Sequence, residues 1–70
     1  MNGHLKLRVL LSIYYKDSFI IPRALLTPHY GYGKLRSEGL ISVRKQNNLY
    51  YVTVTEIGEA FIAVSLMEYE

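Results

Sequence analysis

The sequence predicts an α+β protein, mainly α-helical, and three observations support this class. Residues 4–16 and 56–70 repeat apolar side chains at the spacing of an amphipathic helix. Residues 40–54 are rich in β-branched and aromatic side chains on both sides of two asparagines, which indicates a β-hairpin. Between these elements, threonine followed by proline at 27–28 is a typical start of a further helix.

The first helix is expected over residues 4–16, HLKLRVLLSIYYK. Its apolar positions at i, i+3, i+4 and i+7 are Leu7, Leu10, Leu11 and Tyr14, which predicts one buried stripe. Lys6, Arg8 and Lys16 are interpreted as ordinary solvent-facing charges.

Residues 18–26, SFIIPRALL, allow two interpretations. Phe19–Ile21 suits a short extended segment, and Pro22 suits the first turn of a short helix that would bury Leu25 and Leu26. The alternative is a single irregular apolar loop.

A second helix, Pro28–Glu38, is predicted to follow after a tight turn, with Thr27 as its N-cap. Gly39 is a good residue to end it. Two short helices joined by such a turn form a helix-turn-helix arrangement.

Two glycines lie inside this second helix, and each lowers helix stability by about 1 kcal/mol relative to alanine. A helical wheel places Gly31 on the inner side with Leu35, where it would allow close helix packing. Gly33 is placed on the outer side, where the missing side chain would allow close approach to DNA. The alternative is that His29–Gly33 forms a turn and only residues 34–38 are helical.

The hairpin is predicted to turn at Asn47–Asn48, because asparagine tolerates positive φ. The residues with the spacing of its buried face are Ile41, Val43, Val52 and Val54. Thr55 is expected to cap the last helix, with Glu56 well placed for the helix dipole.

The predicted order is helix, extended piece, helix, turn, helix, hairpin, helix. It resembles a winged helix-turn-helix domain, as in MarR-like, PadR-like and small archaeal or archaeal-virus regulators. Residues 35–41, LRSEGLI, are similar to the family's L-x-x-x-G-L-I junction between recognition helix and wing. Residues 50–58, YYVTVTEIG, are similar to its Y-x-L-T-x-x-G stretch. The resemblance implies a single winged-helix domain over residues 1–70.

A helix that enters the major groove needs small or polar outer residues, with cations at its margins. The candidate DNA contacts on the predicted recognition helix are His29, Tyr30, Gly33, Lys34, Arg36 and Ser37. The resemblance implies a wing on a minor groove or phosphates, with Arg44, Lys45, Asn47 and Asn48 at its tip. A solvated hairpin tip explains the same residues. Arg23 is a candidate backbone contact, while Tyr30 and Tyr32 have core or interface packing as their alternative.

The last helix carries more apolar side chains than one domain can cover. Its predicted interface residues are Ile57, Phe61, Val64 and Met67. A large exposed apolar patch is usually an interaction surface. We therefore expect a two-fold homodimer in which residues 56–70 form the dimerisation helix. Two recognition helices would then meet half-sites about one DNA turn apart.

Charge is unevenly distributed along the 70 residues. Residues 1–50 hold eight Lys and Arg and two acids, a net charge of +6, whereas residues 51–70 hold four acids and no Lys or Arg. A basic part of this kind indicates an anionic partner. The primary hypothesis is therefore a sequence-specific transcriptional regulator that binds double-stranded DNA. The alternatives are a winged-helix adaptor for transcription or replication machinery, and an RNA-binding or architectural protein.

Other classes find little support in the sequence. There is no cysteine, the two histidines are isolated, and the acids are not clustered, so neither catalysis nor a metal or other cofactor is expected. No apolar run reaches about 20 residues, and no signal-peptide pattern is present, so we expect a cytoplasmic protein. No small-molecule ligand is evident.

Overall fold

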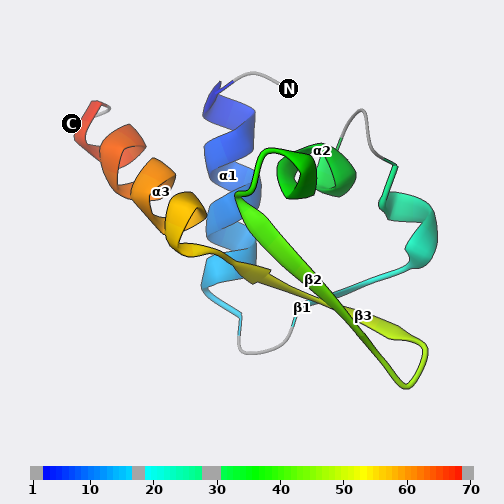
Figure 1. Cartoon of the computed structure of the whole chain (residues 1–70). Helices are drawn as coiled ribbons and strands as arrows, with labels where there is room; N and C mark the ends of the chain where they lie inside the picture. Colours follow the sequence, from blue (N-terminus) through cyan, green and yellow to red (C-terminus); the bar gives the residue numbers. More distant parts are fainter. Residues whose placement is uncertain (1–2, 17–18, 28–30, 69–70) are drawn as a thin grey trace.

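The computed structural model describes residues 3–16, 19–27 and 31–68. The chain folds as a small α+β protein in which helices hold more residues than strands. In chain order the elements are α1 (Gly3–Tyr14), β1 (Phe19–Ile21), the 3-10 helix η1 (Arg23–Leu25), α2 (Gly31–Ser37), β2 (Ile41–Gln46), β3 (Leu49–Val54) and α3 (Glu56–Glu68). Figure 1 shows α1 beside α3, with the β2–β3 hairpin projecting away from both.

The strands form one antiparallel sheet in the order β1-β3-β2. Val52 of the central strand lies opposite Phe19 on one side and Val43 on the other. Ile41 lies opposite Val54 in the same register. Alternate residues of a strand face the same side, so the four predicted inward residues of the hairpin do share one face. The extended segment at 19–21 is also confirmed, and its pairing with β3 adds a third strand.

The hairpin turn consists of Asn47 and Asn48, whose φ angles are 52° and 65°. A two-residue loop with positive φ at both positions is a type I′ turn, and its twist matches that of the flanking strands. Asparagine adopts this region more easily than most side chains. The predicted hairpin and its turn are therefore confirmed.

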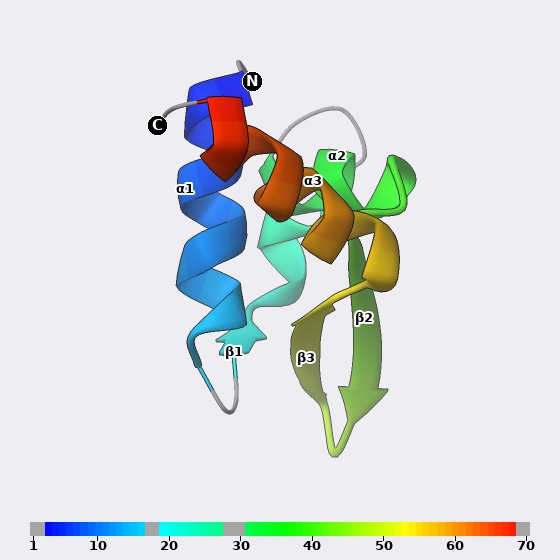
Figure 2. The ribbon, with the colours of Figure 1, turned by 90° about the vertical axis from the view of Figure 1, so that its left-hand side faces the viewer.

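The core lies between the inner sheet face and the helices, and Figure 2 shows α1 and α3 along one side of it. Leu10 of α1 and Leu35 of α2 are fully buried at its centre. The buried α1 residues are Leu7, Leu10 and Ile13, whereas Tyr14 is 51% exposed. The predicted stripe was wrong at its end, because α1 contacts both β3 and α3 and the resulting buried arc includes Ile13.

The predicted first helix of the helix-turn-helix pair is wrong in kind. It is a single 3-10 turn, in which the Leu25 and Leu26 N–H groups donate to the carbonyls of Pro22 and Arg23 at 3.0 Å. One such turn presents no continuous apolar face to the core. Accordingly Leu25, which was expected inside, is 46% exposed, and Leu26 is half-buried.

The end of α2 matches the prediction. Gly39 has a φ of 79°. Its N–H donates to the Arg36 carbonyl, and the Leu40 N–H donates to the Leu35 carbonyl, both at 3.0 Å. These two bonds form a Schellman motif.

The start of α2 differs from the prediction. The described helix begins at Gly31, so Gly31–Gly33 is helical rather than a turn. The predicted start at Pro28 lies outside the described residues. The Thr27 hydroxyl donates to the Ala24 carbonyl at 3.4 Å, a contact within its own turn rather than an N-cap of α2.

Thr55 caps α3 as predicted. Its hydroxyl oxygen accepts the Gly58 N–H at 3.0 Å, which satisfies one of the free donors of the first turn. The same hydroxyl donates to the Gly39 carbonyl at 2.6 Å. One side chain thus starts α3 and ties it to the end of the α2 turn.

The buried face of α3 consists of Gly58, Ile62 and Ser65. Ile57, Val64 and Met67 are 63%, 55% and 75% exposed, so most of the predicted apolar stripe faces outward. Phe61 is different, because it is half-buried and packs against the core. No helix in the described part of the chain is long and apolar enough to cross a bilayer.

Candidate nucleic-acid interface

Five basic side chains extend from three neighbouring elements. Arg23 lies on η1, Lys34 and Arg36 lie on α2, and Arg44 and Lys45 lie on β2; all five are exposed. Figure 1 shows η1, α2 and the hairpin on the side of the molecule away from α3. The described acids of α3 are Glu56, Glu59 and Glu68, so the uneven charge of the sequence also separates in space.

The two glycines of α2 have the opposite roles from those predicted. Gly33 is buried, and a Cβ there would overlap the Thr27 carbonyl group. Gly31 has a φ of 62° with no atom within 4 Å of an added Cβ. Gly33 is therefore not a DNA-facing position, because the Leu26–Thr27 backbone covers that flank of α2. Gly31 is needed for its backbone conformation, not for packing.

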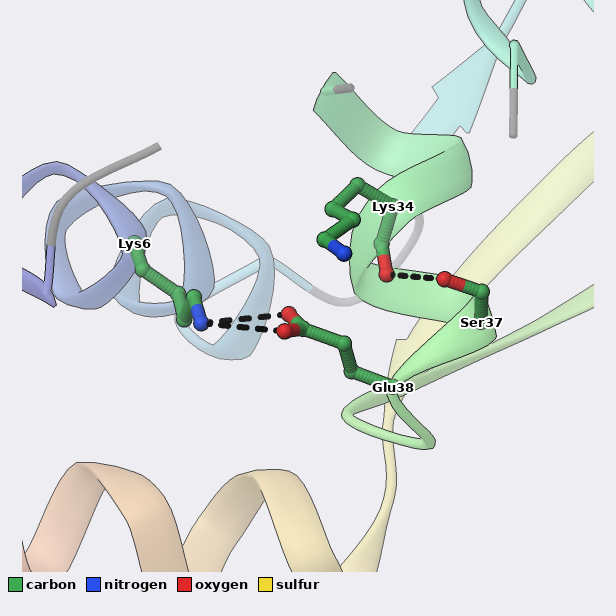
Figure 3. Close-up of polar contacts among 4 residues, drawn as sticks. All are labelled: Lys6, Lys34, Ser37 and Glu38. Carbon is green, nitrogen blue, oxygen red and sulfur yellow. Dashed lines mark hydrogen bonds and ion pairs between the residues drawn. The ribbon is translucent and has the colours of Figure 1, made fainter. Parts of the chain in front are cut away.

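The exposed positions of α2 are Lys34, Arg36 and Ser37, which the sequence placed on or beside its outer face. The Ser37 hydroxyl donates to the Lys34 carbonyl at 2.8 Å, as Figure 3 shows. Its oxygen keeps acceptor capacity for a further donor. Lys34 and Arg36 are two residues apart and therefore leave the helix about 200° apart, one on each side of the covered flank.

An ion pair joins α1 to the end of α2. Lys6 Nζ lies 3.1 Å from Glu38 Oε1, and Figure 3 shows the two side chains pointing toward each other. Lys6 is also 5.6 Å from the centre of the Phe61 ring of α3. The prediction that Lys6 is an ordinary solvent-facing charge was therefore wrong. These partners are 32 positions apart in sequence for the ion pair, and no local pattern indicates such a contact.

The hairpin presents basic and amide groups at its tip. Arg44 lies opposite Tyr51, and Lys45 lies opposite Tyr50. Successive residues of a strand face opposite sides, so these two cations point to different faces of the hairpin. Asn47 and Asn48 are exposed beyond them. The tip can thus approach an anionic surface with either face.

The tyrosines and histidine near α2 have different standings. His29 and Tyr30, both candidate contacts, lie outside the described residues. Tyr32 is half-buried, with its ring 5.7 Å from the Phe19 ring, so its alternative role in packing is what the structure has. Arg23 remains a candidate for a backbone contact.

The described side chains provide charge and hydrogen-bond donors rather than reactive groups. No group of three or more metal-ligating side chains is found within residues 3–16, 19–27 and 31–68. The surface formed by η1, α2 and the hairpin can bind an anion through Lys, Arg, Asn and Ser side chains. Comparisons with protein-family models, curated proteins and solved structures found no match to this chain.

Proposed function

We propose that the protein is a winged-helix transcriptional regulator that binds double-stranded DNA in a sequence-specific manner. In this proposal α2 faces the major groove, and the β2–β3 hairpin is the wing that contacts the adjacent minor groove or phosphates. The order of elements, with a short strand before the helical pair and a hairpin after it, agrees with the order expected for such a domain.

The observation that carries the proposal is the separation of charge. The cations Arg23, Lys34, Arg36, Arg44 and Lys45 are exposed on η1, α2 and the hairpin. DNA carries about one phosphate charge per 1.7 Å of helix axis, so a cluster of exposed cations gains affinity by releasing counterions. The acidic α3 lies away from this surface, where phosphate repulsion is weakest (Figure 1).

The dimensions of the molecule suit this arrangement. The seven residues of α2 span about 10 Å at 1.5 Å per residue, close to the width of about 12 Å of the major groove. The longest dimension of the molecule is 40 Å, slightly more than the length of one DNA turn, about 34 Å. A single copy can therefore contact one groove through α2 and the neighbouring backbone through the hairpin.

The covered flank of α2 limits which residues can contact bases. Gly33 and its neighbours face the Leu26–Thr27 backbone, so Lys34, Arg36 and Ser37 are the described residues that remain for base edges. Arginine and lysine donate to the guanine O6 and N7 acceptors, which gives discrimination of about 1–3 kcal/mol per good pair. A site with one or two guanines opposite α2 is expected.

The proposal is tested by titrating labelled duplexes, with random and genomic sequences, at several salt concentrations. Arg36→Ala should reduce specific affinity by about 1–3 kcal/mol, while Lys45→Ala should lower the slope of log affinity against log salt by about 1 for all sequences. Lys16→Gln is the matched control, because it removes one positive charge from outside α2 and the hairpin.

Equal losses in Arg36→Ala and Lys16→Gln would mean that only net charge matters, which contradicts a reading helix. A wild-type protein that does not bind duplex DNA at low salt would overturn the proposal. That result would favour the adaptor alternative, which the exposed apolar side chains of α3 also support.

A further inference from the structure

A groove lies between α1 and α3, on the side of the molecule away from the hairpin. It has a volume of about 250 Å³. Its apolar and aromatic lining consists of Leu11, Tyr14, Tyr15, Ile62, Ala63 and Leu66, and Glu59 completes it. Pockets for small-molecule ligands usually measure about 300–1,000 Å³. The groove is therefore better matched to a few protein side chains than to a separate ligand.

Exposed apolar side chains continue from this groove over the outer face of α3. Ile57, Val64 and Met67 are all more than half exposed, and Leu66 is 43% exposed. Ala60 and Ala63 are exposed between them, and such small residues allow another helix to approach closely. The 13 residues of α3 span about 20 Å, so this face is long enough for a helix-on-helix contact.

The charges on the two helices identify the occupant. Helix α1 carries Lys6 and Arg8 with no acid, and α3 carries Glu56, Glu59 and Glu68 with no base. Lys6 is paired with Glu38, but neither Arg8 nor Glu59 forms an ion pair within 4 Å with another residue of the described part. If α3 met only another α3, acids would face acids. If α3 met α1 of a second copy, acids would face bases.

We propose that the groove and the outer face of α3 bind the same surface of a second copy of this chain. The two-fold contact places α3 of each copy over the groove of the other, so that α1, α3 and their two counterparts form a four-helix arrangement. Val64 and Met67 fill the apolar centre, and Arg8 faces the acidic residues of the opposite α3. A standard interface buries about 800 Å² per partner, which is about a sixth of the 5052 Å² surface of one chain.

This contact differs from the dimer expected from the sequence in two respects. Phe61 belongs to the core and lies beneath Lys6, so it is not an interface residue. The α1 side chains Arg8, Leu11 and Tyr15 recur at i, i+3 and i+7, and they join the interface in its place. The interface concerns the free protein, so it does not rest on DNA binding.

The first test is the sedimentation of the full chain between about 1 and 100 µM without DNA. Wild type should associate to a dimer, and Val64→Glu should weaken the association by about a hundredfold or more, because it buries an unpaired charge. Leu49→Glu is the matched control: Leu49 is 42% exposed on the hairpin, and its change should leave the dimer intact. A wild type that stays monomeric, or a Val64→Glu protein that remains dimeric, would overturn the proposal.

The second test mixes two charge-reversed proteins. Arg8→Glu alone and Glu59→Lys/Glu68→Lys alone should each dimerise about tenfold more weakly, because like charges meet in both homodimers. In an equimolar mixture, the acidic α1 of one protein meets the basic α3 of the other, so heterodimers should form with nearly wild-type affinity. The pair of changes on α3 covers both ends of the helix, so the result holds for either relative direction of the helices.

A mixture no tighter than either variant alone would reject contact between α1 and α3 of different copies. Circular dichroism confirms that each variant is folded. DNA binding is measured separately, so a monomer that still binds duplex DNA would remove this interface while leaving the proposed function in place.

Discussion

Helices α2 and α3 are held in the molecule by different means. Helix α3 is 13 residues long and begins with a threonine cap, and two acids lie in its first turn, where they favour the helix dipole. Helix α2 has seven residues, begins at a glycine with positive φ, and has no acid in its first turn. A helix this short is unstable alone in water, so contacts with the rest of the chain must supply its stability.

Those contacts surround α2 on two sides. Leu35 is fully buried on one side, and Gly33 lies against the Leu26–Thr27 backbone on the other. The Schellman motif and the Lys6–Glu38 ion pair hold its end. The comparison teaches that the orientation of α2, and with it the placement of Lys34 and Arg36, depends on the packing of the whole domain rather than on local sequence.

The largest expected effect comes from the one feature that the two helices share. Each has a glycine at which a Cβ would overlap a backbone carbonyl, that of Leu40 for Gly58 and that of Thr27 for Gly33. Gly58→Ala should destabilise the protein by about 3 kcal/mol, because the added methyl also meets Val54 Cγ1 at 2.7 Å within the sheet. Gly33→Ala should destabilise it by about 2 kcal/mol, since the exposed η1 segment can shift more easily. Chemical denaturation measures both.

The order of these two effects is the sensitive part of the prediction. Alanine has the higher helix propensity by about 1 kcal/mol, so a position without steric overlap would gain stability. A Gly33→Ala protein that is more stable than wild type would mean that the Leu26–Thr27 backbone does not cover α2. The outer face of α2 would then be wider than the structure describes.

The next effect separates a capping threonine from a threonine that only precedes a helix. Thr55→Ala should lose about 1–2 kcal/mol, because both the α3 cap and the bond to the Gly39 carbonyl disappear. Thr27→Ala is the matched control, with one long hydrogen bond to its own turn, and should change stability by less than about 0.5 kcal/mol. Thermal unfolding of the two variants gives the comparison. Equal losses would show that Thr27 also supports α2.

The same contrast explains which parts of the fold follow from the sequence. The hairpin, its Asn47–Asn48 turn and the Thr55 cap are determined by residues close together in the chain, and all three were predicted correctly. The Gly39 end of α2 belongs to the same class, because a C-terminal glycine acts on its own turn. Local rules are sufficient where local hydrogen bonds determine the conformation.

The errors lie where distant segments meet. The helical wheel assumed a single buried face for the α2 segment, and it therefore could not place Gly33 beneath the Leu26–Thr27 backbone. Periodicity on α3 ranked Ile57 and Val64 with Phe61, although only Phe61 packs on the core. An almost uniformly apolar helix carries little information on which side is buried. The exposed cations of α2 were nevertheless identified, because charged side chains are rarely buried without a partner.

The smallest expected effect on stability concerns the ion pair at the end of α2. Glu38→Gln removes a partly exposed pair with Lys6, so stability should fall by at most about 1 kcal/mol. In the proposed DNA complex, however, the change also removes an acid beside Lys34 and releases the charge of Lys6. Duplex affinity at low salt should therefore rise several-fold, and the gain should shrink as salt screens the phosphates. Lys6→Met removes the same ion pair but also one positive charge, so it should lower or preserve affinity. If Glu38→Gln weakens duplex binding as much as Lys6→Met, the pair positions α2 for DNA, and its charge is of secondary importance.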